Sequence, residues 1–267
     1  YHMQGLVLKS TGKWYQVLLE DGQQVQASIR GKLRLEGLKT TNPIAAGDRV
    51  EIEAGSDESW AILSVVPRHN YIVRKATNLS KQMQILAANV DRAYLVVTLK
   101  SPITQIAFID RFLVTAEAYG IETVLVFNKI DTFDEAMLDE QLYLQHIYSE
   151  IGYKCLKVSA VEKKGIAELK TMMTGKVSMF SGHSGVGKST LVNALEPNLN
   201  LKTKHISEQS KQGQHTTTFA EMYDLSFDAR IIDTPGIKGF GIVDMEPSEI
   251  SGYFPEFFKL KDQCKFN

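Results

Sequence analysis

Cysteine is scarce in this sequence, and charge of neither sign dominates it. Only two of the 267 residues are cysteines, Cys155 in an apolar segment and Cys264 in a polar one, and we expect no disulfide between them in a reducing compartment. The formal net charge is -1. A nucleic-acid partner would therefore have to be held by local basic patches, because the total charge gives no attraction.

Long apolar runs are also lacking. No stretch approaches the ~20 apolar residues of a membrane-spanning helix, and the N-terminus has no basic stretch followed by an apolar core. Neither a transmembrane helix nor a signal peptide is indicated, so we expect a cytoplasmic protein without a membrane partner. Tyr1 and His2, before the first methionine, are interpreted as the remnant of an expression tag.

Short β-type runs separated by turn residues fill the first part of the chain, residues 3–66. The pair Asp21-Gly22 is a strong hairpin signal, and Gly12 and Gly47 mark further turns. Five short strands in about sixty residues predict a small all-β barrel, of which the OB-fold is the commonest type at this size. The predicted strands are residues 6–9, 14–19, 25–29, 49–54 and 61–66.

Two basic segments are candidates for RNA contact. The first is the loop with Arg30, Lys32 and Arg34, which a solvated loop on the rim of the barrel explains equally well. The second is the connector, residues 67–90, in which no acidic residue occurs between 68 and 84. A linker beside a nucleic-acid surface has this composition, and so does an ordinary solvated linker. The basic residues of the connector are Arg68, Arg74, Lys75 and Lys81.

Residues 91–245 alternate between buried-strand and amphipathic-helix patterns, which predicts an α/β domain with a mainly parallel sheet. A final pair of strands, residues 219–225 and 229–232, is expected to be antiparallel. Residues 246–267 are then predicted to begin with a helix and to form the start of a further, C-terminal domain. The other predicted strands are 92–98, 123–127, 154–158 and 177–180, and the predicted helices are 106–119, 134–151, 165–173 and 188–195.

A phosphate loop of the pattern G-x-x-x-x-G-K-[ST] lies between a predicted strand and a predicted helix. Backbone N–H groups at such a helix N-terminus bind anions, and the glycines allow the backbone to come close to them. Lys188 is expected to reach the β and γ phosphates and to support catalysis, and Ser189 to ligate Mg²⁺. The predicted loop residues are Gly182, His183, Ser184, Gly185, Val186, Gly187, Lys188, Ser189 and Thr190.

The tetrapeptide D-T-P-G follows at the distance expected of a magnesium and γ-phosphate sensor. Asp233, at the end of a strand, would hold Mg²⁺ through water, and the N–H of Gly236 would bond the γ-phosphate. Alone, this tetrapeptide is also typical of a surface turn. Its spacing from the phosphate loop makes the functional interpretation more specific.

The sequence N-K-I-D after another predicted strand indicates recognition of guanine. The Asp131 carboxylate can accept from N1–H and the 2-amino group of guanine, which adenine does not offer. Asn128 would brace the loop and bond N7, and Lys129 would lie across the base. Ser159 and Ala160 would present a backbone N–H to the guanine O6. Without these neighbours the tetrapeptide would be only a helix-capping turn.

These motifs occur in an unusual order along the chain. The guanine-reading N-K-I-D precedes the phosphate loop by more than fifty residues, whereas it normally follows it. The order predicts a circularly permuted GTPase domain, in which the fold has been cut and rejoined elsewhere.

The segment that ends in Gly-Gln-His-Thr-Thr-Thr is the expected first switch. Thr217 or Thr218 is favoured as the magnesium ligand that completes the site. Ile237 follows D-T-P-G where many GTPases carry a water-orienting glutamine, so intrinsic hydrolysis should be slow. His215 is the candidate to position or deprotonate water, although a loop histidine is more often structural or merely exposed.

Taken together, the motifs resemble the bacterial ribosome small-subunit-dependent GTPase A family. The resemblance covers essentially the whole chain and includes residues 84–91 and 109–113, N-K-I-D, G-H-S-G-V-G-K-S-T, G-Q-H-T-T-T and D-T-P-G. It implies late assembly of the 30S subunit, with an OB-fold on 16S rRNA and hydrolysis of GTP stimulated by the subunit. No DNA partner is expected, and we expect a monomer.

The resemblance also implies a C-terminal zinc domain with Cys, Cys, His and Cys ligands. Cys264 resembles the first of these ligands, and the others do not appear within the 267 residues. One cysteine cannot hold zinc, so we expect Zn²⁺ only in a longer protein.

Two other functions compete with this interpretation. A metabolic P-loop enzyme could transfer phosphate to a small molecule, but guanine selectivity and Ile237 argue against it. A nucleotide-gated RNA-binding module would hydrolyse GTP only incidentally.

Overall fold

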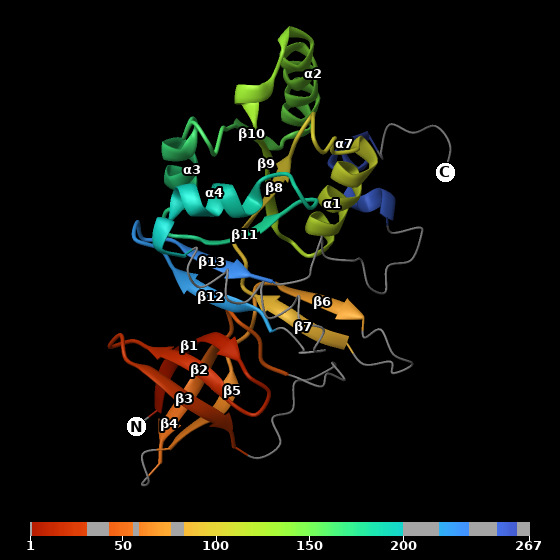
Figure 1. The fold of residues 1–267 in the computed structure, drawn as a ribbon. Helices are drawn as coiled ribbons and strands as arrows, with labels where there is room; N and C mark the ends of the chain where they lie inside the picture. The colour runs from red at the N-terminus through yellow and green to blue at the C-terminus, as the bar shows by residue number, and fades with distance from the viewer. Residues whose placement is uncertain are drawn as a thin grey trace.

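Residues 2–30, 43–55, 59–75, 83–199, 219–234 and 250–260 are described by the structure, which is a computed structural model. Figure 1 shows a small barrel at one end of the molecule, an α/β domain at the other, and a two-stranded hairpin beside their junction. The barrel comes first in the chain and the α/β domain after it.

Five strands close into the predicted N-terminal barrel. Hydrogen bonding runs in the order β1-β2-β3-β5-β4 and returns from β4 to β1, with β3 and β5 parallel and the other pairs antiparallel. Alternate residues point inward, so Val7, Tyr15, Val17, Ile52 and Ile62 fill the interior. The strands are β1 (His2–Ser10), β2 (Tyr15–Leu19), β3 (Gln24–Ile29), β4 (Arg49–Ala54) and β5 (Trp60–Val65).

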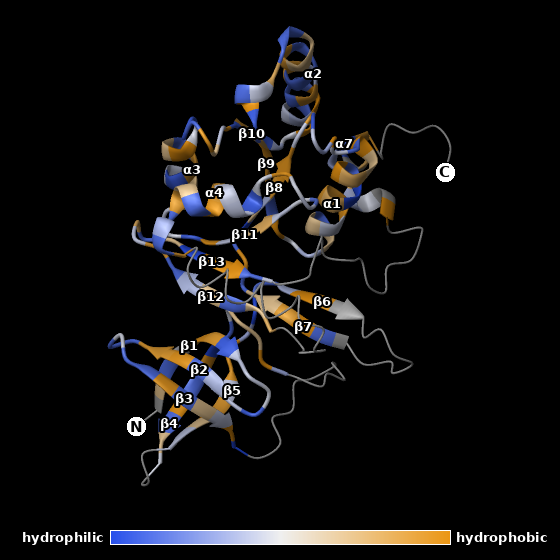
Figure 2. Ribbon diagram, in the orientation of Figure 1, coloured by the Kyte–Doolittle hydropathy of each residue, from blue (hydrophilic) through white to orange (hydrophobic). Residues whose placement is uncertain are grey.

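The α/β domain is built on a sheet in the order β10-β9-β8-β11-β13-β12. Its first five strands are parallel, and β12 pairs antiparallel with β13, as predicted. The strand β8 is buried along its whole length, as a parallel sheet covered on both faces requires. The neighbouring strands β9 and β13 are also largely hydrophobic, which Figure 2 shows in orange. The strands are β8 (Arg92–Val97), β9 (Glu122–Phe127), β10 (Lys154–Lys157), β11 (Val177–Ser181), β12 (Glu221–Asp224) and β13 (Arg230–Asp233).

Helices cover both faces of this sheet. α1 and α2 pack on one face through Ile109 and Leu144, and α3 and α4 pack on the other through Leu169 and Leu191. All four begin and end within two residues of the predicted bounds, because their apolar periodicity is strong. The helices are α1 (Ile106–Ala118), α2 (Glu135–Ile151), α3 (Ile166–Met173) and α4 (Lys188–Leu195).

The segment predicted as a connector contains a hairpin. β6 (Tyr71–Lys75) pairs antiparallel with β7 (Met83–Ala88), and Ile72, Val73 and Ile85 are buried. The sequence interpretation gave weight to the basic residues and missed this apolar pattern. Much of residues 67–90 is therefore structured and not a plain linker.

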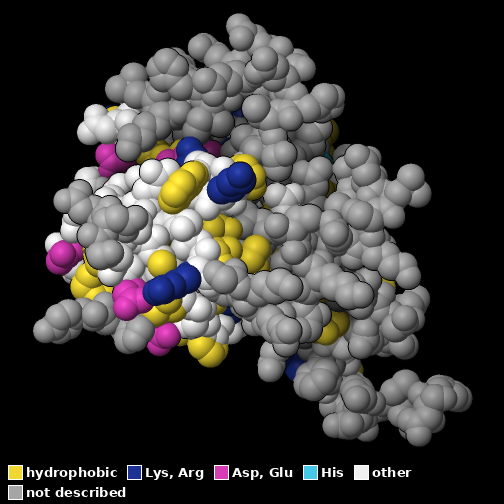
Figure 3. All heavy atoms as spheres, turned by 90° about the horizontal axis from the view of Figure 1, so that it is seen from below, with side chains coloured by type: hydrophobic (Ala, Val, Ile, Leu, Met, Phe, Trp, Pro, Cys, Tyr) yellow, Lys and Arg dark blue, Asp and Glu magenta, His cyan; other side chains and the backbone are white. Residues whose placement is uncertain are grey.

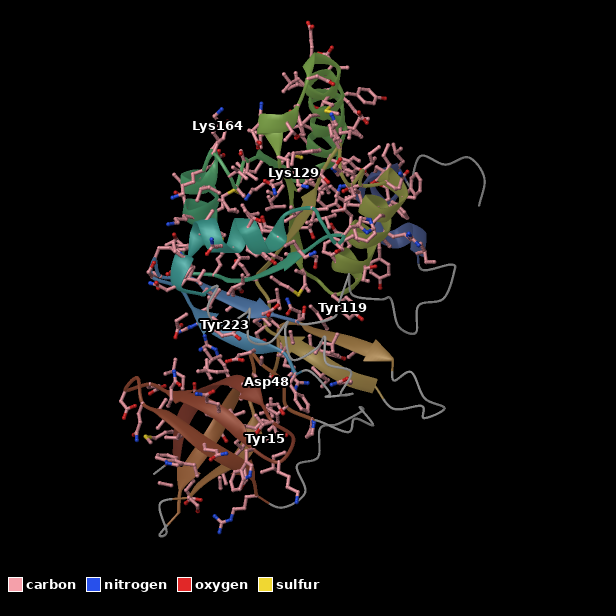
Figure 4. All side chains as sticks on the ribbon, viewed as in Figure 1. Tyr15, Asp48, Tyr119, Lys129, Lys164 and Tyr223 are labelled. Atoms are coloured by element: carbon pink, nitrogen blue, oxygen red, sulfur yellow. The ribbon has the colours of Figure 1, made fainter. Side chains whose placement is uncertain are left out.

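Arg68, counted among the basic residues of the connector, is not available for RNA contact. Its guanidinium forms two hydrogen bonds with the Asp48 carboxylate, from Nε to Oδ1 at 2.6 Å and from Nη2 to Oδ2 at 2.7 Å. The side chains of Arg68 and Asp48 are only 8% and 0% exposed. The pair therefore fastens the hairpin segment to the barrel, and Figure 4 shows Asp48 on the side of the barrel that faces the α/β domain.

A tight backbone contact fixes the same junction. Gly47 has φ +95°, and its carbonyl accepts a hydrogen bond from the Asn89 amide at 2.9 Å. A Cβ added to Gly47 would lie 1.9 Å from the Ala88 carbonyl oxygen. Only glycine fits this position, because both the backbone conformation and the space exclude a side chain.

Gly47→Ala is therefore expected to lower the melting temperature measured by differential scanning calorimetry. The positive φ alone costs about 1 kcal/mol or more, and the backbone clash adds to it. Gly12→Ala is the matched control, because Gly12 has φ +91° but nothing within 4 Å of the added Cβ. Equal shifts in the two variants would show that the contact with Ala88 is not tight.

The barrel and the α/β domain also share one continuous sheet. β1 pairs antiparallel with β12 at a single register position, Lys9 opposite Glu221. β12 follows the predicted first switch in the chain, and β13 leads into D-T-P-G. The barrel is thus hydrogen-bonded to the hairpin that connects the two predicted switches.

Of the C-terminal segment, residues 250–260 are described. They form a 3₁₀ turn, η3 (Ser251–Tyr253), and a short helix, α7 (Pro255–Leu260), which lie beside α1 in Figure 1. Cys264, the predicted zinc ligand, lies outside the described residues. Within the described parts of the chain, no helix is both long enough and apolar enough to cross a membrane.

Candidate nucleotide-binding site

The predicted nucleotide-binding segments meet at one edge of the sheet. Asn128 follows β9, Ser159 follows β10, Gly182 follows β11, and Asp233 ends β13. Because these strands are parallel, their carboxyl ends lie together, where open α/β sheets bind their ligands. The permuted order of the motifs leaves this convergence intact.

Asn128 links three of the segments. Its side chain is buried, and its Nδ2 donates to the Val186 carbonyl of the phosphate loop at 2.9 Å. Its Oδ1 accepts from the backbone N–H of Ala160 at 3.2 Å. These are hydrogen bonds of the kind that the predicted bracing role of Asn128 requires. In this arrangement the Ala160 N–H, which we expected to face the guanine O6, is bonded to Asn128.

Lys129 connects the guanine-reading loop to the phosphate loop. Its Nζ donates to the Gly185 carbonyl at 2.7 Å and to the Ser101 carbonyl at 2.6 Å. Figure 4 shows Lys129 above α4, where β9 ends. The contact with Ser101 was not predicted, because the loop between β8 and α1 has no motif. Pro102 of that loop lies close to Gly185, 3.3 Å from where a Cβ there would be.

Ser159 holds Asp131 in place. The Ser159 hydroxyl is buried and donates to Oδ1 of Asp131 at 2.5 Å, while it accepts from the backbone N–H of Glu162 at 3.0 Å. Asp131 itself is exposed. A carboxylate oriented in this way by one oxygen can present its edge to the two N–H donors of a guanine.

A small cavity lies between these groups. Its volume is about 130 Å³, below the 300–1,000 Å³ of pockets that enclose a whole small molecule, so it suits part of a ligand such as a flat ring. Thr132 and Val161 had not been predicted. The only sequence signal for them is their position, since Thr132 directly follows N-K-I-D and Val161 directly follows Ser159-Ala160. The lining residues are Asn128, Lys129, Asp131, Thr132, Ala160, Val161, Gly187 and Thr190.

Three glycines of the phosphate loop have backbone conformations and close contacts that exclude or disfavour a side chain. Gly182, Gly185 and Gly187 have φ values of +146°, +87° and +93°. A Cβ on Gly187 would lie 2.5 Å from Nδ2 of Asn128, and one on Gly182 would lie 2.5 Å from the Val96 carbonyl oxygen. Helix α4 starts immediately after the loop, so its free N–H groups face the same space.

Lys188 points back into this loop. Its ammonium donates to the carbonyls of Gly182 and His183, the latter at 3.1 Å, and burial lowers the pKa of the side chain. The ring of His183 packs against Phe108 of α1, with 3.8 Å between centroids and an angle of 35° between the ring planes. Ser184 and Ser189 are exposed at the mouth of the loop. A half-buried cation bonded only to carbonyls suits an anionic ligand.

Asp233 is suited to a cation. Burial raises the pKa of its carboxyl, and the charge of Glu221 raises it further. Side chains of Tyr223 and Ile231, two residues from Glu221 and Asp233, pack in the same core cluster as α4. Asp233 therefore lies on the face of the sheet that carries Ser189 at the start of α4.

The described residues do not form a complete cage for a metal ion. No group of three or more His, Cys, Asp or Glu side chains occurs among them. The described candidates for metal ligands are the Ser189 hydroxyl and the Asp233 carboxylate, which are hard oxygen donors of the kind that Mg²⁺ takes. The predicted residues His215, Thr217, Thr218 and Gly236 lie outside the described residues.

Comparison with known proteins identifies the family. The RsgA N-terminal domain profile matches residues 4–62, and the RsgA GTPase profile matches residues 65–243. This chain belongs to the RsgA family. Its relatives include the small ribosomal subunit biogenesis GTPases RsgA of Flavobacterium johnsoniae, 69% identical over 99% of this chain and 82% of the relative, and of Bacteroides fragilis, 51% identical over 99% and 85%.

Solved RsgA-type structures have the same fold. YjeQ from Thermotoga maritima superimposes with a TM-score of 0.79 at 38% identity, over 96% of this chain and 83% of that one. YloQ, described as a circularly permuted GTPase, gives a TM-score of 0.73 at 26% identity, over 100% and 83%.

RsgA membership confirms three of the predictions. The chain is a circularly permuted GTPase, it hydrolyses GTP, and its N-terminal barrel is the RsgA N-terminal domain, an OB-fold. The family is that of the small ribosomal subunit biogenesis GTPases. The alternative of a small-molecule phosphotransferase is thereby set aside.

Proposed function

We propose that this chain binds GTP and GDP with Mg²⁺ at the carboxyl edge of its sheet. The observation that carries the proposal is the convergence on Asn128, whose amide joins the phosphate loop to the Ser159–Ala160 turn. In this proposal Asp131 reads guanine, Lys129 lies along the base, and the glycines with Lys188 cradle the phosphates. Ser189, Asp233 and a threonine of 217–218 hold Mg²⁺, which offsets negative charge on the phosphates.

We further propose that the GTPase acts on the small ribosomal subunit late in its assembly, as a monomer in the cytoplasm. The printed names of the relatives support the partner. In this proposal GTP favours docking on the subunit, and hydrolysis releases the protein. His215 positions the water, and Gly236 senses the γ-phosphate. Zinc would bind at Cys264 only where further ligands follow in a longer chain.

The barrel is the proposed contact with 16S rRNA. Where the surface in Figure 3 is coloured, basic and acidic side chains lie side by side and form no uniform basic patch. Arg30, one of the predicted RNA contacts, pairs with Glu53 at 3.0 Å but remains 70% exposed. Phosphate contacts by this arginine would therefore replace a weak surface ion pair. Lys32 and Arg34 lie outside the described residues.

Sedimentation with purified 30S subunits tests the proposal. The protein with a non-hydrolysable GTP analogue is expected to pellet with the subunits at least about tenfold more tightly than the protein with GDP, a coupling of ~1.4 kcal/mol. Lys188→Ala should remove this difference, because the variant does not hold the phosphates. Equal pelleting with the two nucleotides would contradict a nucleotide-controlled switch, and pelleting with 50S subunits alone would contradict the partner.

A further inference from the structure

Three side chains form a row across the junction between the barrel and the GTPase domain. Lys9 of β1 lies directly opposite Glu221 of β12, and Glu221 lies directly opposite Asp233 of β13. Residues opposite one another in antiparallel strands carry their side chains on the same face, with Cβ atoms about 5 Å apart. The row therefore runs from the barrel to the predicted magnesium ligand.

The charges in this row are unbalanced. Lys9 and Glu221 form an ion pair, with 2.9 Å between Nζ and Oε2, and their side chains are 35% and 22% exposed. Glu221 and Asp233 are both carboxylates, and like charges directly opposite in a sheet repel each other. The hydroxyl of Tyr223, which burial and the Glu221 charge keep protonated by raising its pKa, is a further neighbour of Glu221. Lys9 brings a positive charge to the row through its ion pair with Glu221.

We propose that Lys9 and Glu221 are positioning residues of the magnesium site, through which the barrel sets the electrostatic field at Asp233. Glu221 adds negative charge beside the ion, and Lys9 offsets part of that charge. The barrel thus contributes to nucleotide binding without touching the nucleotide. This inference rests on the proposed magnesium role of Asp233.

The two members of the ion pair make opposite predictions, which separates this role from simple docking of the barrel. Lys9→Met leaves Glu221 uncompensated, so Mg²⁺ is attracted more strongly. Glu221→Gln removes a negative charge and leaves Lys9 near the ion, so Mg²⁺ is attracted less. If the ion pair only held the barrel in place, both substitutions would weaken the site in the same direction, because both break the same contact.

The experiment is a calorimetric titration of Mg²⁺ into the GDP-bound protein at low ionic strength. Relative to the parent, the dissociation constant for Mg²⁺ is expected to fall about threefold in Lys9→Met and to rise about threefold or more in Glu221→Gln, because a unit charge roughly 10 Å from a divalent ion is worth about 0.8 kcal/mol at low ionic strength. The double variant restores the net charge of the parent and should return close to the parent value. Lys9→Arg should also match the parent.

Asp224→Asn is the matched control on the same hairpin. Asp224 pairs with Arg230 at 2.6 Å, directly opposite in the same two strands, but it lies three residues, about 10 Å, along β12 from Glu221. Its effect on the Mg²⁺ affinity should be smaller than that of Glu221→Gln, because Asp224 lies farther from Asp233 than Glu221 does and its side chain is 52% exposed to high-dielectric water.

Each outcome has a distinct meaning. Shifts in opposite directions with a restored double variant support the inference. Unchanged constants in both single variants, or shifts in the same direction, overturn it while the proposed function stands. If GDP binding by the parent does not respond to Mg²⁺, or if Asp233→Asn retains the parent response, the magnesium assignment in the proposed function fails first.

Discussion

Asp131→Asn is expected to reverse the base preference of the site. The substitution replaces an acceptor that faces two N–H groups of guanine by an amide that can donate. Loss of two such bonds, each worth about 1.5 kcal/mol with a charged acceptor, weakens GTP binding by about 100-fold, and at least tenfold if one bond survives. Xanthosine triphosphate has a carbonyl where guanine has its 2-amino group, so its affinity should rise relative to that of GTP.

The structure explains why this variant should still fold. An asparagine Oδ1 can accept the hydrogen bond from the Ser159 hydroxyl as the carboxylate does, and Asp131 is otherwise exposed. Competition titrations with GTP, ATP and xanthosine triphosphate measure the preference. Asp134→Asn is the matched control, because Asp134 loses the same charge three residues away but caps α2 by accepting from the Met137 N–H at 2.9 Å. A parent protein that binds ATP as tightly as GTP would refute the assignment of Asp131.

Local patterns in the sequence were sufficient to predict much of this fold. Five short β-type runs separated by turn residues predicted the barrel, and the regular alternation of strand and helix patterns from residue 91 predicted the parallel sheet. Motif spacing then predicted that Asn128, Gly182 and Asp233 belong to one site, and in the structure each lies at or just after the carboxyl end of a parallel strand, at the same edge of the sheet.

Contacts between distant segments could not be predicted in this way. The Lys129 ammonium reaches Ser101 through a loop without any motif, and Arg68 finds Asp48 only after the barrel has closed. The basic composition of residues 68–84 indicated a linker, either beside a nucleic-acid surface or simply solvated, whereas the burial of Ile72 and Ile85 depends on packing against the rest of the fold. The row Lys9, Glu221 and Asp233 depends on the register of three strands, which no single segment encodes.

Two features of the site bear on its rate of hydrolysis. The side chain after D-T-P-G is Ile237, which cannot orient water as glutamine does. Asn128, Lys129 and Lys188, which we propose hold the nucleotide, are each bonded to backbone carbonyls. We therefore expect the group that acts on water to be His215 or a group of the small ribosomal subunit.

Small ribosomal subunits are therefore expected to accelerate GTP hydrolysis by this protein by about 100-fold or more, the range that a correctly placed general base contributes. Alone, the protein should turn over on the order of 10⁻⁴ to 10⁻³ per second, as unassisted GTPases do. Phosphate release under single-turnover conditions, with and without purified 30S subunits, measures both rates.

His215→Ala should abolish most of this stimulation while leaving the affinity for GDP nearly unchanged, because the proposed role of the imidazole is to position water and not to hold the nucleotide. His205→Ala is the matched control, since it removes the same side chain ten residues earlier in the same predicted switch segment. If His215→Ala is stimulated as strongly as His205→Ala, the residue is structural and the ribosomal subunit itself supplies the group that activates water.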